Sequence, residues 1–211
     1  ELRCEAVPTL YVACDGTGVP MRKEETRGRK GKAPDGTSAT REVKLGCVFS
    51  SHGVDEKGHP VRDENSTTYV ASFEPAEDFG LKLRQEAVLR GIAKAQRKVF
   101  IGDGAFWVWN LARTNFPGSI EILDFYHACE HLASLADALW PNLKPAEKVK
   151  RWIACLEAGQ LPNVLAQAKK ALPHHGPRRA AALREIEYFK TNSARMQYDA
   201  FRKQEIGRAH V

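Results

Sequence analysis

The segment 98–131, KVFIGDGAFWVWNLARTNFPGSIEILDFYHACEH, decides the fold, because it contains two apolar runs that each end in an aspartate. Residues 99–101 precede Asp103, and residues 120–123 precede Asp124. Short apolar runs bounded in this way predict two buried strands, with a short helix between them. Glycines flank Asp103 and allow a backbone, a phosphate or a metal ion to approach it closely. We therefore expect Asp103 to lie at the rim of a sheet.

A second aspartate follows a strand near the start of the chain. Residues 10–14 form an apolar run that ends at Asp15, and we expect the strand to end there in a turn. Further strands are expected over 42–51, with one apolar face, and over 67–73. An amphipathic helix over 77–96 then leads to the Asp103 strand. The order β-β-β-α-β-α-β predicts an α/β protein with a mixed sheet that begins as an antiparallel meander.

The second half of the chain is expected to be helical, with breaks at prolines and glycines. We divide the chain into a sheet domain at 1–127, a helical subdomain at 128–204 and a tail at 205–211. The tail ends in IGRAHV, which matches the translation of a common sequencing adapter. We therefore expect the tail to be non-native and the chain to be a truncated fragment. The helices of the subdomain are expected over 128–139, 145–158, 161–171, 177–190 and 193–204.

The composition favours a cytoplasmic protein and leaves a nucleic-acid partner open. The chain carries 32 basic and 26 acidic side chains, for a net charge of +6. Five scattered cysteines without a CxxC pair favour a reducing compartment, and no segment approaches the roughly 20 apolar residues that span a membrane. The segment 22–32 is a basic arm, either a contact for the DNA backbone or a solvated loop. Its basic residues are Arg22, Lys23, Arg27, Arg29, Lys30 and Lys32.

Asp15 and Asp103 are the candidate catalytic residues. Taken singly, each is typical of an ordinary turn. In the predicted strand order, however, the first and fourth strands are neighbours, so the two carboxylates would lie side by side. Neighbouring carboxylates repel each other and attract a cation, and hard oxygen ligands suit Mg²⁺ or Mn²⁺. Such ions support the in-line transfer of a phosphoryl group.

Four segments in this order resemble the RNase H-like catalytic domain of DDE transposases, in particular the bacterial insertion-sequence transposases of the ISKra type and the related Mutator-like lineage. The likeness covers nearly the whole chain. The segments are YVACDGTGVPM at 11–21, FIGDGAFWVWNLA at 100–112, DFYHACEHL at 124–132 and RMQYDAFRKQ at 195–204.

The resemblance implies that Asp15 and Asp103 are the first two catalytic carboxylates and ligands of Mg²⁺ or Mn²⁺. It implies that Asp124 and His127 support the active site or contact DNA, and that the helical block is the insertion before a final glutamate. The expected glycine turn and glutamate do not follow Gln204, so we expect the fragment to be inactive. The full-length parent would cleave and transfer strands at transposon ends as a homo-oligomer, with target DNA as its second partner.

Several alternatives stay open. A nuclease or resolvase would use the same carboxylates without strand transfer, and a non-catalytic remnant would only bind DNA. His127, Cys129 and His131 with Cys14 are possible zinc ligands, although their helical spacing is poor. The aromatic residues after Asp103 would either stack on unpaired bases or pack in the core; they are Phe106, Trp107 and Trp109.

Overall fold

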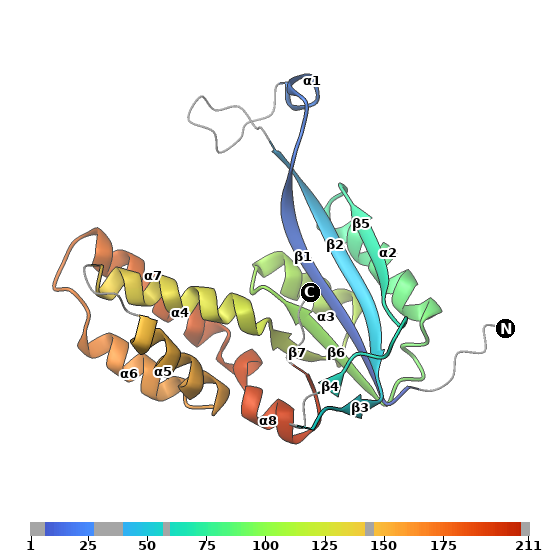
Figure 1. Ribbon diagram of the computed structural model, residues 1–211. Helices are drawn as coiled ribbons and strands as arrows, with labels where there is room; N and C mark the ends of the chain where they lie inside the picture. The colour runs from blue at the N-terminus through green and yellow to red at the C-terminus, as the bar shows by residue number, and fades with distance from the viewer. Residues whose placement is uncertain (1–6, 28–39, 57–59, 142–145, 208–211) are drawn as a thin grey trace. The chain divides into compact units, whose positions relative to one another are not determined.

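A computed structural model describes residues 7–27, 40–56, 60–141 and 146–207 (Figure 1). They form an α/β fold with a five-stranded mixed sheet in the order β5-β2-β1-β6-β7. The predicted α/β class with a mixed sheet is therefore confirmed. The strands are β1 (Thr9–Pro20), β2 (Thr40–Ser51), β5 (Thr68–Ser72), β6 (Arg97–Gly102) and β7 (Ile120–Leu123), and β3 (Gly53–Val54) pairs separately with β4 (Pro60–Val61).

The chain divides into two compact units, which we describe separately. The sheet unit comprises residues 1–52 and 62–120, and the helical unit comprises 53–61 and 121–210. The structural boundary follows residue 120, whereas the boundary expected from the sequence follows residue 127. The helices are α1 (Lys23–Thr26), α2 (Ala76–Leu89), α3 (Phe106–Asn115), α4 (Phe125–Leu139), α5 (Ala146–Glu157), α6 (Leu161–Lys170), α7 (Pro177–Thr191) and α8 (Tyr198–Lys203), with a 3₁₀ turn at Ser193–Met196.

β1 is the central strand of the sheet unit. It pairs in antiparallel fashion with β2 along its whole length, from Thr9 opposite Ser51 to Pro20 opposite Thr40. On its other side it pairs in parallel with β6, but only as far as Cys14. The predicted meander and the predicted neighbourhood of the first and fourth strands are both confirmed. The predicted end of the first strand is wrong, because β2 continues the ladder and holds Asp15 inside β1.

The expected apolar face of β2 is also only partly correct. Residues 46–51 are buried, whereas Leu45 on the supposed apolar face is 41% exposed. The reason is that α2 packs on the opposite face, where a Cβ atom at Gly46 would lie 2.7 Å from the Leu83 side chain. A helix that covers a strand needs a small residue beneath it, and that residue reads as polar in a simple alternation pattern.

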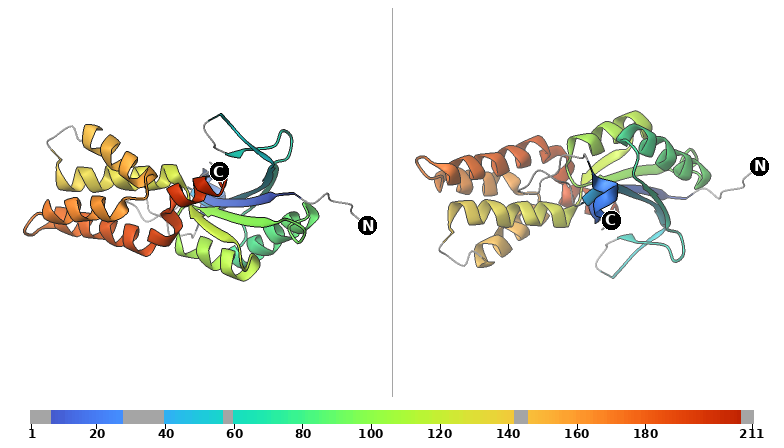
Figure 2. Two further views of the ribbon diagram at one scale, coloured as in Figure 1. Left: turned by 90° about the horizontal axis from the view of Figure 1, so that it is seen from below. Right: turned by 90° about the horizontal axis from the view of Figure 1, so that it is seen from above.

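α2 and α3 cover the same face of the strands in the sheet unit (Figure 2). A Cβ atom at Gly102, the last residue of β6, would collide with Val108 of α3, so the helix lies directly on the strand end. α2 ends at Leu89, seven residues before the predicted end, because Gly91 adopts φ +80 and the helix cannot continue through it.

The helical unit is built on the pairing of α4 with α7, which lie side by side (Figures 1 and 2). Its C-terminal segment returns to β7: the Tyr198 hydroxyl donates to the Leu123 carbonyl oxygen at 3.0 Å, and Arg195 Nε lies 2.6 Å from Glu121 Oε2. Within the described residues, no helix has the length and apolarity needed to cross a membrane. The core residues include Leu132, Leu135, Trp152, Ile186 and Phe189.

Replacement of Gly102 by alanine tests the close approach of α3 to β6. The added methyl group has to displace Val108, a stiff β-branched side chain, so we expect a loss of about 1–3 kcal/mol in the free energy of unfolding. Urea denaturation followed by circular dichroism measures it. Gly53→Ala is the control, since its Cβ atom would meet nothing within 4 Å. Equal stability of the two variants would contradict the packing described.

Candidate functional site

The structure brings Asp15 and Asp103 together in the sheet unit. Both residues directly follow the last register pair of the parallel ladder, Cys14 opposite Gly102. Neighbouring strands lie about 4.8 Å apart, and side chains two residues apart along a strand point to the same face. Since Ala13 lies opposite Ile101, the next positions of the same parity are Asp15 of β1 and Asp103, the first residue after β6. The two carboxylates therefore occupy adjacent positions at one edge.

Backbone hydrogen bonds orient both carboxylates. The Gly16 N–H donates to Asp15 Oδ1 at 2.6 Å, and the Ala105 N–H donates to Asp103 Oδ1 at 2.8 Å. Gly104 between the latter two residues adopts φ +98, a conformation that favours glycine, and so permits the turn around Asp103. Both aspartates are half-buried. Each side chain is thus held in place while it remains accessible from solvent.

The two carboxylates affect the pKa of the buried Cys14 thiol. Burial raises the pKa of Cys14 well above its ordinary value, and the negative charges of Asp103 and Asp15 raise it further. Both negative charges thus disfavour the thiolate form of this buried side chain. The thiol consequently stays protonated at neutral pH and serves as a core side chain, as expected from the sequence.

The side chains of Glu42 and Trp107 pack against the backbone next to Asp15, at Gly16, and the sequence alone did not predict this contact. A Cβ atom at Gly16 would lie 2.9 Å from Glu42 Oε1 and 3.3 Å from the Trp107 ring. Glu42 in turn pairs with the buried Lys44 at 3.0 Å, and the Lys44 ammonium lies 5.7 Å from the centroid of the Trp107 ring. The signal in the sequence was Lys44, a charged residue inside a predicted strand.

Asp124 and His127 belong to the helical unit, where Asp124 has a clear local role. Its Oδ1 accepts hydrogen bonds from the backbone N–H groups of Tyr126 (2.8 Å) and His127 (3.0 Å), so it is the N-cap of α4. The His127 side chain lies 3.7 Å from Glu130. The helix thus begins at Phe125, three residues before the predicted start, because Asp124 satisfies its first N–H groups.

The zinc alternative finds no support in the geometry. His131 Nδ1 lies 2.6 Å from Glu185 Oε2, and the imidazole stacks on the Tyr188 ring at 3.6 Å. In the part of the chain that the structure describes, no three His, Cys, Asp or Glu side chains are arranged to hold a metal ion. His131 is therefore a packing residue between α4 and α7. Within the described residues, Asp15 and Asp103 likewise belong to no group of three or more such side chains.

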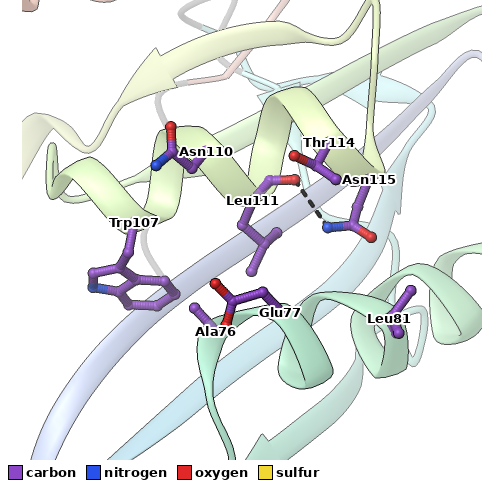
Figure 3. A pocket seen from close by; sticks show the side chains of 8 residues that line it. All are labelled: Ala76, Glu77, Leu81, Trp107, Asn110, Leu111, Thr114 and Asn115. Atoms are coloured by element: carbon purple, nitrogen blue, oxygen red, sulfur yellow. Dashed lines mark hydrogen bonds between the residues drawn. The ribbon is translucent and has the colours of Figure 1, made fainter.

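The three aromatic residues that follow Asp103 separate into different environments. Trp109 is 4% exposed and meets Phe100 edge to face, as a core residue does. Trp107 lines a groove of about 240 Å³ between α2 and α3, together with Leu81 and Leu111 (Figure 3). Phe106 is 77% exposed at the start of α3. Among the three candidates for base stacking, Phe106 is the most exposed, and Trp107 is half-buried.

The predicted DNA-contact residues of the basic arm are only partly described. Arg22 and Arg27 flank α1 and are exposed. Of Lys23 only the backbone is described, as the first residue of α1. The remaining members of the basic arm, Arg29, Lys30 and Lys32, lie outside the described residues.

Neither protein-family models nor curated proteins give a match for this chain. The likeness to transposases therefore rests on the ordered motifs, and the geometry of Asp15 and Asp103 is independent of it.

Raising the pH tests the environment of Cys14. Because the folded thiol keeps its proton while the unfolded thiol ionises above about pH 8.5, the unfolded state binds fewer protons there, and stability falls as the pH rises. We expect urea denaturation curves to give a steeper decline for the wild type than for Cys14→Ala, by up to about 1.4 kcal/mol per pH unit. Identical slopes would show that the thiol is not shielded.

Removal of the Asp124 carboxylate tests the N-cap. Asp124→Ala should lower the free energy of unfolding by about 1 kcal/mol, because two N–H groups at the start of α4 lose their acceptor. Asp124→Asn should keep most of the stability, since asparagine is also a good N-cap. Asp137→Ala, at an exposed position in the last turn of α4, is the control and should cause no loss. Thermal unfolding of all three variants decides the point.

Proposed function

We propose that this chain contains the two-carboxylate core of an RNase H-like DDE transposase, which cleaves and joins DNA strands by metal-dependent phosphoryl transfer. The observation that carries the proposal is the parallel register of β1 and β6, which puts Asp15 of β1 beside Asp103, the first residue after β6. The adjacency of the first and fourth strands, after an antiparallel meander, is the arrangement that the transposase resemblance implies.

The residues present fit Mg²⁺ or Mn²⁺. Both donors are carboxylates, the ligand type that these ions prefer, and backbone N–H groups fix the orientation of each. A bound ion would lower the pKa of a coordinated water and stabilise charge on the phosphoryl oxygens. Asp15 and Asp103 would hold the ion, and the electrostatic repulsion between them would decrease when it binds.

DNA is the proposed substrate and partner. The net charge of +6 and the exposed Arg22 and Arg27 favour an interaction with a phosphate backbone. The exposed ring of Phe106, three residues after Asp103, is suited to stacking on an unpaired base. In this proposal the helical unit is the insertion subdomain, and the transposase acts as a homo-oligomer on transposon ends and target.

A second candidate function is DNA binding without turnover. It is favoured by one observation: within the described residues, no group of three or more His, Cys, Asp or Glu side chains is arranged to hold a metal ion. The nuclease or resolvase alternative would likewise require such a group. We therefore expect this chain to bind metal and DNA, and strand transfer to require a further carboxylate.

A titration with Mn²⁺ tests the carboxylate pair. Asp103→Asn and Asp15→Asn should each weaken Mn²⁺ binding at least tenfold, because each removes one of the two charged ligands. Isothermal titration calorimetry, or the loss of the free Mn²⁺ signal in electron paramagnetic resonance, measures the affinity. Asp78→Asn, on an exposed turn of α2, is the matched control and should bind as the wild type does. Unchanged binding by Asp103→Asn would rule out this residue as a ligand.

A further inference from the structure

The edge strand β5 carries side chains on the same face as Asp15. Tyr69 of β5 lies opposite Cys47 of β2, and Cys47 lies opposite Ala13 of β1. Residues that are directly opposite each other share a face of the sheet. Tyr69 is therefore on the face of Ala13 and of Asp15, which is two residues further along β1. In the next row, Leu45 of β2 lies directly opposite Asp15.

This part of the face is apolar and open to solvent. Tyr69 is 76% exposed, Leu45 is 41% exposed and Phe73, directly after β5, is 40% exposed. Ala71 lies between the two aromatic residues and is itself exposed, so its small side chain leaves the space between the rings open. An exposed group of large apolar side chains on a soluble domain commonly marks a binding surface.

Two arginines flank the exposed rings. The Arg41 guanidinium lies 4.6 Å from the centroid of the Phe73 ring, which places Phe73 on the face of Arg41. At the other end, the Arg62 guanidinium lies 3.8 Å from the Phe49 ring, and Arg62 also donates to the Thr67 hydroxyl at 3.4 Å. The surface therefore carries positive charge on both sides of Tyr69.

Two acidic side chains of the adjoining segments, Asp63 and Glu74, are paired with basic partners of their own. Asp63 pairs with His52, and Glu74 pairs with Lys82 at 2.5 Å. We call the surface formed by Arg41, Leu45, Arg62, Tyr69 and Phe73 the aromatic strip.

We propose that the aromatic strip binds an unpaired stretch of a nucleic-acid strand and leads it toward Asp15. Bases stack on the exposed rings of Tyr69 and Phe73, while Arg41 and Arg62 contact phosphates on either side. Two strand spacings and two residue steps place Tyr69 about 12 Å from Asp15, close enough for one strand to reach both. The inference deepens the proposed function, since it assigns a single-stranded segment of DNA to the same carboxylate site.

Charge and position favour nucleic acid over a protein partner. Tyrosine and arginine are also enriched in protein interfaces, but both charged side chains of the strip are cations, and the strip shares its face with the carboxylate pair. Duplex DNA hides the faces of its bases, so a stacking surface selects unpaired strands.

Fluorescence anisotropy with a labelled oligothymidylate, in EDTA to exclude metal ions, tests the proposal. Tyr69→Ala should weaken binding about tenfold, because base stacking on an aromatic ring contributes about 1–3 kcal/mol, whereas Tyr69→Phe keeps the ring and should retain the affinity. Affinity for a duplex of the same length should change little. Leu81→Ala is the matched control, as Leu81 is 60% exposed on α2 and outside the strip; it should bind as the wild type does.

The salt dependence separates the role of the arginines from that of the ring. Arg62→Gln should reduce the slope of log K against log salt by about 0.7, the value for one phosphate contact with a single strand. Tyr69→Ala should weaken binding at every salt concentration and leave the slope unchanged. An unchanged slope in Arg62→Gln would contradict the phosphate contact.

Wild-type affinity in Tyr69→Ala would overturn the aromatic strip and leave the proposed metal site standing. The same holds if light scattering shows that Tyr69→Ala alters self-association while its DNA affinity is unchanged, since the strip would then be a protein interface. Conversely, loss of affinity in Tyr69→Ala together with unchanged Mn²⁺ binding by Asp103→Asn would support the strip and overturn the carboxylate site. A wild type that binds neither oligonucleotide would overturn the strip and the proposed DNA partner, whereas the carboxylate site is still decided by the Mn²⁺ titration.

Discussion

The structure of the candidate site depends on the two different ladders of β1. As far as Cys14, β1 is held on both sides, by β2 and by β6; beyond Cys14, only β2 remains as its partner. Asp15 is the first residue past this change. It therefore has a rigid backbone, fixed by the antiparallel ladder, and an open side where β6 has turned away at Asp103. A strand that lost both partners at once would leave this carboxylate on a mobile turn.

The layer of helices beneath the sheet completes this arrangement. Gly46 and Gly102 admit α2 and α3 into direct contact with the strands, and Gly16 admits the Trp107 ring behind Asp15. Three glycines in three strands thus remove side chains from the helix-covered face, while the opposite face carries the carboxylates and the aromatic strip. The packing face and the proposed binding face are separated by the pleat of the strands.

Much of this fold could be predicted from hydrophobic patterns alone. The apolar runs that end at Asp15 and Asp103 gave the two central strands and their adjacency, since a helical crossover returns a strand in parallel beside an earlier one. The boundaries were less predictable. Asp15 precedes a glycine-rich segment that reads as a turn, and only pairing with β2, more than 25 residues later in the chain, keeps it extended. Likewise, Asp124 reads as the end of a strand, although its capping of α4 decides its local geometry. The exposure of Tyr69 could not be predicted, because the pattern of β5 does not reveal that this strand forms an edge.

The return of the C-terminal segment to β7 has a consequence for how the helical unit acquires its structure. Leu123 meets the Tyr198 hydroxyl 75 residues later, and Glu121 meets Arg195 74 residues later. Contacts so distant in sequence form slowly, because a long loop has to close before they contribute. On the ribosome, α4 to α7 emerge before the residues that complete their unit. Until Tyr198 has been synthesised, the nascent helices expose apolar surface that a chaperone is able to bind.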